Sequence, residues 1–132
     1  MPKIEVDIKI LRSMFITSQG DIRAAEILKN TGSINSILKL YYDVLHVLAD
    51  ILLRFDQFES TNHICIFAYV CKNPDLDWNF FERIRTVRNG ICYHGTPVKE
   101  EEWKRLELQA QLHIQALTQM VEDKINNFLA NI

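Results

Sequence analysis

Hydrophobic residues recur at every third or fourth position over most of this chain, which is the spacing that gathers them on one side of an α-helix. Residues 34–57 show this most strongly, because two apolar stripes run side by side there. The stripes are Ile34, Ile37, Tyr41, Leu45, Leu48, Leu52 and Phe55, and Leu40, Val44, Val47 and Ile51. A helix that is apolar on most sides must be buried on most sides. We therefore expect this segment either to be the central helix of a bundle or to turn its second stripe towards another subunit.

The end of the chain carries a second clear helical pattern. A single apolar stripe runs through Trp103, Leu106, Ala110, Ile114, Leu117, Val121, Ile125 and Phe128. Ahead of it, Thr96-Pro97 is typical of an N-cap followed by proline in the first helical turn. Three glutamates at 100–102 would then favour the positive end of the helix dipole. The sequence predicts one long helix that begins at Pro97.

The first thirty residues are less regular. Apolar positions at helical spacing favour a helix over 3–18, although the alternation from Lys3 to Ile10 also fits a strand. Ser18-Gln19-Gly20-Asp21 predicts a break or kink, with Asp21 as the N-cap of a short helix that continues to Lys29. Gly32 is suited to the left-handed conformation that ends a helix.

Two shorter segments complete the predicted fold. Residues 60–72 fit a strand or a helix by composition, and helix is favoured because an N-cap at 60–62 and Asn73-Pro74 bracket them. Asp75 or Asp77 would cap the next helix, which carries Arg88 and Asn89 to Gly90. The expected architecture is all-α, a single domain over 1–132 folded as an antiparallel four- to five-helix up-and-down bundle.

Composition narrows the class further. The chain has 132 residues, only 4 Gly and 3 Pro, and a net charge of -2, which argues against a broad surface that coats nucleic acid. A small basic cleft remains compatible with that charge, because phosphate affinity follows local charge. No signal peptide or membrane-length apolar run is evident, and the three cysteines are an odd number. We expect a cytoplasmic protein with reduced thiols.

Positive charge gathers in one stretch, from Arg83 to Lys99. It holds three arginines, one lysine and one histidine and no Asp or Glu, in a chain with 17 acidic residues. At its centre lies Arg88-Asn89-Gly90-Ile91-Cys92-Tyr93-His94-Gly95. This pattern predicts a local phosphate-binding site.

The residue types in this stretch suit cleavage of RNA, whose own 2′-hydroxyl is the nucleophile. The reaction needs proton transfer, which His94 could supply, and positive charge on the phosphate, which Arg88 could supply through two hydrogen bonds. Asn89 could orient the histidine or donate to phosphate, and Tyr93 could stack on a base. Arg85 and Lys99 are further candidates for substrate binding. Cys92 and His94 lack the paired spacing of a zinc site, so we expect no metal and no cofactor.

The order of three motifs resembles the HEPN superfamily of small helical proteins. Its signature is an Arg, four to six residues and then a His, here Arg88 and His94, often with a polar residue such as Asn89 after the Arg. Tyr41-Tyr42-Asp43-Val44-Leu45-His46 is similar to its paired-aromatic helix start, and residues 62–69 are similar to its polar-His segment. The resemblance covers about residues 20 to 130.

The resemblance implies an all-α domain that forms a homodimer and brings two Arg/His motifs into one cleft. It implies a metal-independent endoribonuclease, in one setting a toxin with a nucleotidyltransferase-type antitoxin as partner. The alternative is a catalytically silent module that binds RNA, nucleotide or a nucleotidyltransferase. A helical adaptor with no site is the third hypothesis.

Geometry gives the catalytic hypothesis a condition. Residues six apart on an unbroken helix lie ~9 Å apart along the axis and about 120° apart around it, so Arg88 and His94 would diverge. Either the helix breaks at Gly90 or Gly95, or a second subunit supplies the opposing residue. Two structural roles compete with catalysis: Arg88 could pair with Glu82 or Glu102, and His94 could cap the helix end.

Overall fold

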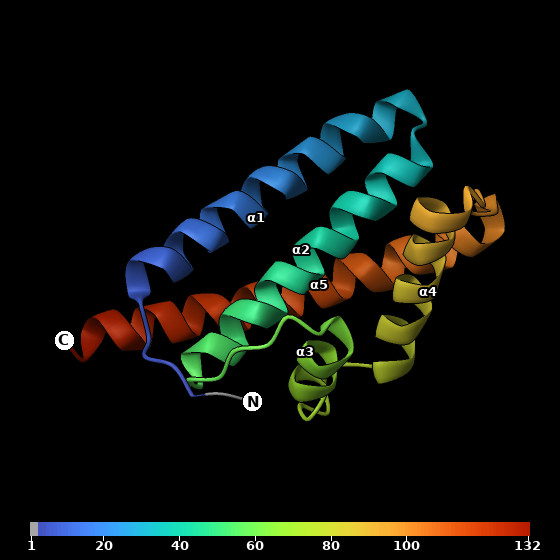
Figure 1. Ribbon diagram of the computed structural model, residues 1–132. Helices are drawn as coiled ribbons and strands as arrows, with labels where there is room; N and C mark the ends of the chain where they lie inside the picture. The colour runs from blue at the N-terminus through green and yellow to red at the C-terminus, as the bar shows by residue number, and fades with distance from the viewer. Residues whose placement is uncertain (1–2) are drawn as a thin grey trace.

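The computed structural model describes residues 3–132 of the chain, and its regular elements there are helices (Figure 1). The helices are α1 (Ile8–Leu28), α2 (Ile34–Phe55), α3 (His63–Val70), α4 (Trp78–His94) and α5 (Glu100–Ala130), with a short 3-10 turn at Lys29–Thr31. The four longer helices alternate in direction, so the predicted all-α up-and-down bundle is confirmed. Within the described residues, no helix has the length and apolar content needed to cross a membrane.

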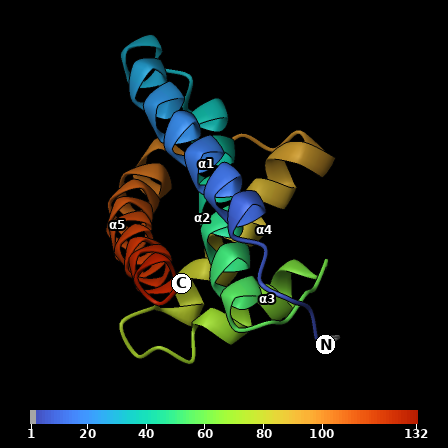
Figure 2. The same ribbon diagram turned by 90° about the vertical axis from the view of Figure 1, so that its left-hand side faces the viewer.

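Helix α2 is the centre of the bundle. Figure 2 shows α1 in front of it, α5 on one side and α3 and α4 on the other, and all four helices contact it. Twelve of its residues are buried, including Tyr41, Tyr42 and Leu48. The two apolar stripes of this helix therefore pack against other helices of the same chain. This agrees with the interpretation that the segment is the central helix of a bundle.

Aromatic side chains hold α3 and α4 against α2. Phe67 of α3 lies with its ring centroid 4.8 Å from that of Phe81 and 5.7 Å from that of Tyr42. Helix α5 contacts the start of α4 through His113, whose ring stacks on Phe80 at 4.3 Å and whose Nε2 accepts the Asp77 backbone N–H at 3.0 Å. These contacts fix the position of α4, which carries most of the cationic stretch from Arg83 to Lys99.

The predictions for the N-terminal third were partly wrong. No break occurs at residues 18–21, because α1 continues through Gly20, and Asp21 caps nothing. Ser18 is buried and its Oγ donates to the Phe15 carbonyl at 2.6 Å, so its hydroxyl is satisfied inside the helix. The helix begins at residue 8, not residue 3, because Asp7 accepts the backbone N–H of Lys9 and of Ile10. Residues 4–7 form no regular element, and an isolated antiparallel bridge joins Lys3 to Phe58.

The structure decides between the two glycines offered as the end of α4 and corrects the predicted start of α5. Helix α4 continues through Gly90 to His94, and Gly95 ends it in the left-handed conformation with φ 64°. Helix α5 begins at Glu100 with Lys99 as N-cap, so Thr96-Pro97 lies in the connection. The three glutamates do occupy the first turn of α5, as expected.

Candidate functional site

The candidate site is an open depression formed where α2, α3 and α4 meet. It is lined by Tyr42, Asn62, His63, Ile64, Arg85, Arg88, Asn89 and Tyr93. Four of the six residues predicted as site residues therefore come together there. His94 is exposed and Lys99 is the N-cap of α5, and neither lines the depression.

Arg88 is the cation of this site. Its guanidinium carbon lies 5.0 Å from the ring centroid of Tyr42 and 5.9 Å from that of Tyr93, within the range of cation–π attraction. One amino group lies 3.4 Å from the side-chain oxygen of Asn89, and Nε is buried without a hydrogen-bond partner. None of the ion pairs formed by residues 3–132 involves Arg88. Its charge is held in place by aromatic rings and left available to an anion.

Arg85 lies one turn away on α4 and, unlike Arg88, has a carboxylate partner. Its guanidinium donates to both carboxylate oxygens of Glu82, at 3.3 and 3.1 Å, and this pair raises the pKa of Arg85. Glu82, which the sequence offered as a partner for Arg88, is therefore paired with Arg85. Arg85 therefore adds less net positive charge to the depression than its sequence position suggested.

His63 is a site residue that the sequence did not single out. Its Nδ1 lies 2.7 Å from the Tyr42 hydroxyl, and its ring centroid lies 3.8 Å from that of His46. Burial and then the charge of Arg88 lower the pKa of His63, so the neutral imidazole is favoured. Asn62 caps α3 by accepting the Cys65 backbone N–H at 3.1 Å, which leaves its amide nitrogen free to donate.

The structure answers one part of the condition on Arg88 and His94, because the helix does not break between them. Because α4 is unbroken through both residues, the two side chains diverge around the helix, and Gly95 ends the helix too late to bring them together. A site that uses both residues needs a second copy of the chain. Tyr93 directly precedes His94 on α4, is 71% exposed and is free to stack on a base.

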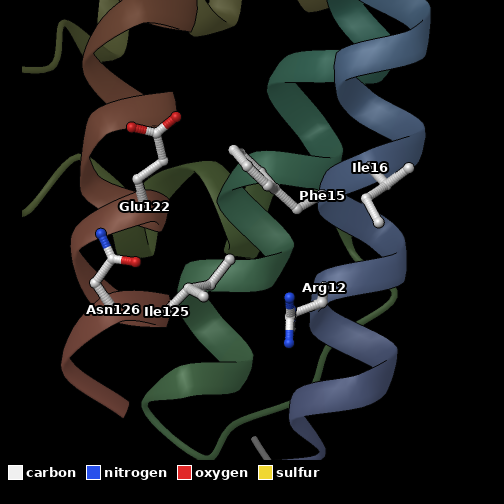
Figure 3. Close-up of a pocket in the computed structure, with 6 residues that line it drawn as sticks. All are labelled: Arg12, Phe15, Ile16, Glu122, Ile125 and Asn126. Carbon is white, nitrogen blue, oxygen red and sulfur yellow. The ribbon is translucent and has the colours of Figure 1, made fainter. Parts of the chain in front are cut away.

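A different hollow lies between α1 and α5 (Figure 3). Arg12 and Phe15 extend from α1 towards α5, Ile125 faces them, and Ile16, Glu122 and Asn126 complete the lining. It holds one cation and one carboxylate among apolar side chains, with no histidine or cysteine. This composition offers no group that transfers protons near neutral pH, so the depression at Arg88 is the stronger candidate.

Among the described residues, no group of three or more His, Cys, Asp or Glu side chains is placed to hold a metal ion. Comparison of this chain with protein-family models, with curated proteins and with solved structures finds no match.

Proposed function

We propose that this protein binds single-stranded RNA at the Arg88 depression and cleaves it as a metal-independent endoribonuclease of the HEPN type. The observation that carries the proposal is the state of Arg88, a cation fixed between two tyrosine rings with no carboxylate partner among the described residues. A guanidinium in this state can bind two oxygens of a phosphate. It would also stabilise the charge that builds on that phosphate during cleavage.

His94 acts as the proton-transfer group in this proposal and reaches the phosphate from a second copy of the chain. Its exposure and its position beyond Tyr93 on α4 are compatible with that role. The cleaving unit is then a homodimer. A toxin paired with a nucleotidyltransferase-type antitoxin is the setting that the family resemblance suggests.

The test is cleavage of a single-stranded RNA in EDTA. The parent protein should cut it, and Arg88→Gln should slow the reaction by about 10²- to 10³-fold because charge stabilisation is lost. His94→Gln should slow it by about 10²- to 10⁴-fold because proton transfer is lost. Arg83→Gln is the matched control, since Arg83 is an exposed arginine on the same helix, donates to Gln109 at 3.5 Å and does not line the depression. Equal loss in Arg83→Gln and Arg88→Gln would contradict the proposal.

One observation favours a second function, a catalytically silent module that binds RNA or nucleotide. Within one chain His94 lies outside the depression, so the binding residues are assembled without the proton-transfer residue. Such a module would bind RNA through Arg88 and cleave none. Affinity that is lost in Arg88→Gln, together with an intact RNA after long incubation with the parent, would establish this function in place of the first.

A further inference from the structure

His63 is fixed in the depression from two sides. Tyr42, 1% exposed, holds Nδ1 through its hydroxyl at 2.7 Å, and His46 packs against the ring at a tilt of 31° with a centroid distance of 3.8 Å. Tyr42 also provides the ring beneath the Arg88 guanidinium, 5.0 Å away. One tyrosine therefore positions both the imidazole and the guanidinium.

The hydrogen bond to the Tyr42 hydroxyl favours the neutral tautomer of His63 that carries its proton on Nε2. Burial raises the pKa of Tyr42 to about 12, so the hydroxyl keeps its proton near neutral pH, and His63 Nδ1 is the hydrogen-bond acceptor placed to receive it. A neutral imidazole that accepts at Nδ1 carries its hydrogen on Nε2. This nitrogen makes no hydrogen bond within residues 3–132, and it is not one of the buried polar atoms that lack a partner. In this tautomer, Nε2–H is a donor open to the depression.

We propose that His63 is a second phosphate-binding residue, whose Nε2–H and the Arg88 guanidinium bind oxygens of the same phosphate in a single-stranded RNA. This inference rests on the proposed binding of RNA phosphate at Arg88, but it does not require that the RNA be cleaved. It separates two roles, since His63 binds phosphate within one chain and His94 transfers protons from the other.

A phosphate bound there changes the charge balance around His63. In the free protein, burial and Arg88 hold the pKa of His63 below its usual range. A bound phosphate adds negative charge beside the ring and raises that pKa, so His63 takes up a proton on binding. The charged ring then donates from Nδ1 to the Tyr42 oxygen, since a hydroxyl can accept as well as donate.

The neighbouring His46 does not offer an alternative site for this proton. His46 has a pKa lowered to about 4 by burial and by the adjacent His63. The charged and titratable groups that face His63 are Tyr42, Asp43, His46 and Asp50 of α2 and Arg85 and Arg88 of α4. The two carboxylates raise the pKa of His63 and the two arginines lower it. The negative charge of a bound phosphate adds to the effect of the carboxylates and so favours the protonated ring.

The test measures binding of 2′-O-methyl tetrauridylate, an RNA analogue that cannot be cleaved and whose phosphodiesters do not titrate in this range. The affinity of the parent should rise between about pH 8 and about pH 5.5, by up to about tenfold for each unit by which the ligand raises the pKa of His63. Arg83→Gln, the control, removes an exposed arginine outside the depression and should show the same rise. His63→Gln, which keeps a donor but cannot titrate, should bind with an affinity that does not change with pH.

NMR titration of the imidazole resonances in the parent gives a readout that needs no substitution. The pKa of His63 should rise when the analogue is added. An unchanged pKa, a pH dependence that persists in His63→Gln, or a parent that does not bind the analogue would overturn the inference. Failure of the nuclease proposal has a different signature, because a parent that binds with this pH dependence but leaves RNA intact keeps the inference and loses the cleavage.

Discussion

At the scale of single residues, two arginines one turn apart on α4 have different partners. Arg85 is paired with Glu82, and Arg88 has no carboxylate partner among the described residues. The sequence identified both as cations in an acid-free stretch and left open a pairing of Arg88 with Glu82. Glu82 lies just outside that stretch, three residues before Arg85 and six before Arg88, and on an unbroken helix the first spacing is the one that forms a pair.

His63 shows why sequence patterns missed part of the site. Tyr42 and His63 are 21 residues apart and lie on different helices. Their contact depends on how α3 packs against α2, and no local spacing encodes it. The paired tyrosines and the Asn62-His63 segment were noticed as family-like motifs, but nothing in the sequence joined them to Arg88.

His46 gives a prediction for stability at this scale. Its pKa in the folded protein is lowered to about 4, below the usual value near 6.5, because its ring is largely buried and lies against His63. The unfolded chain therefore binds a proton that the folded protein refuses as pH falls from about 6.5 towards 4, so folding loses stability over that window. The contribution of His46 is fully present above about pH 6.5.

Replacing this histidine should make the free energy of unfolding less sensitive to acid. In urea denaturation, His46→Leu should show a smaller loss of stability between about pH 7 and about pH 4.5 than the parent. His94→Gln removes an exposed imidazole and serves as the control. The same pH dependence in the parent and in His46→Leu would contradict the assignment.

At the scale of elements, helix periodicity predicted the long helices well and their ends less well. The stripes over 34–57 and 103–128 gave α2 and the body of α5, since burial of a regular stripe is what stabilises a helix in a bundle. The break predicted at residues 18–21 did not occur, and of the two glycines offered as the end of α4, Gly95 ends the helix and Gly90 does not. A helix interior tolerates one glycine at a cost of about 1 kcal/mol, which packing on α2 can offset.

The two glycines near the end of α4 should respond to alanine in opposite ways. Gly95 has φ 64°, where a side chain is disfavoured, so Gly95→Ala should destabilise the protein by about 1–2 kcal/mol. Gly90 is helical, and an added Cβ would lie 3.8 Å from Thr96, an ordinary contact. Gly90→Ala should therefore stabilise by about 0.5–1 kcal/mol, as measured by denaturant unfolding. Destabilisation by both substitutions would show that α4 does not end as described.

At the scale of the whole molecule, burial of α2 does not require a second subunit, because the other helices of the same chain cover it. A site that uses both Arg88 and His94 would need a second copy, because the unbroken course of α4 separates the two residues. Helix geometry gave this condition from the sequence alone. It could not tell which of its two alternatives holds, since that depended on whether Gly90 breaks the helix.

Complementation between inactive variants tests the central claim, that Arg88 of one copy acts with His94 of another, most directly. Arg88→Gln and His94→Gln are each expected to be inactive on RNA in EDTA. After the two are mixed and exchange subunits, a heterodimer contains one site with both native residues. The mixture should regain roughly a quarter of the parent rate, since half of the dimers carry one intact site of two.

The matched control replaces His94→Gln by a chain that carries both substitutions, and that mixture should stay inactive. Recovery of RNA cleavage in the first mixture alone is the predicted result. A first mixture that stays as inactive as its two components, although subunits exchange and the parent cuts the same RNA, would contradict the shared site.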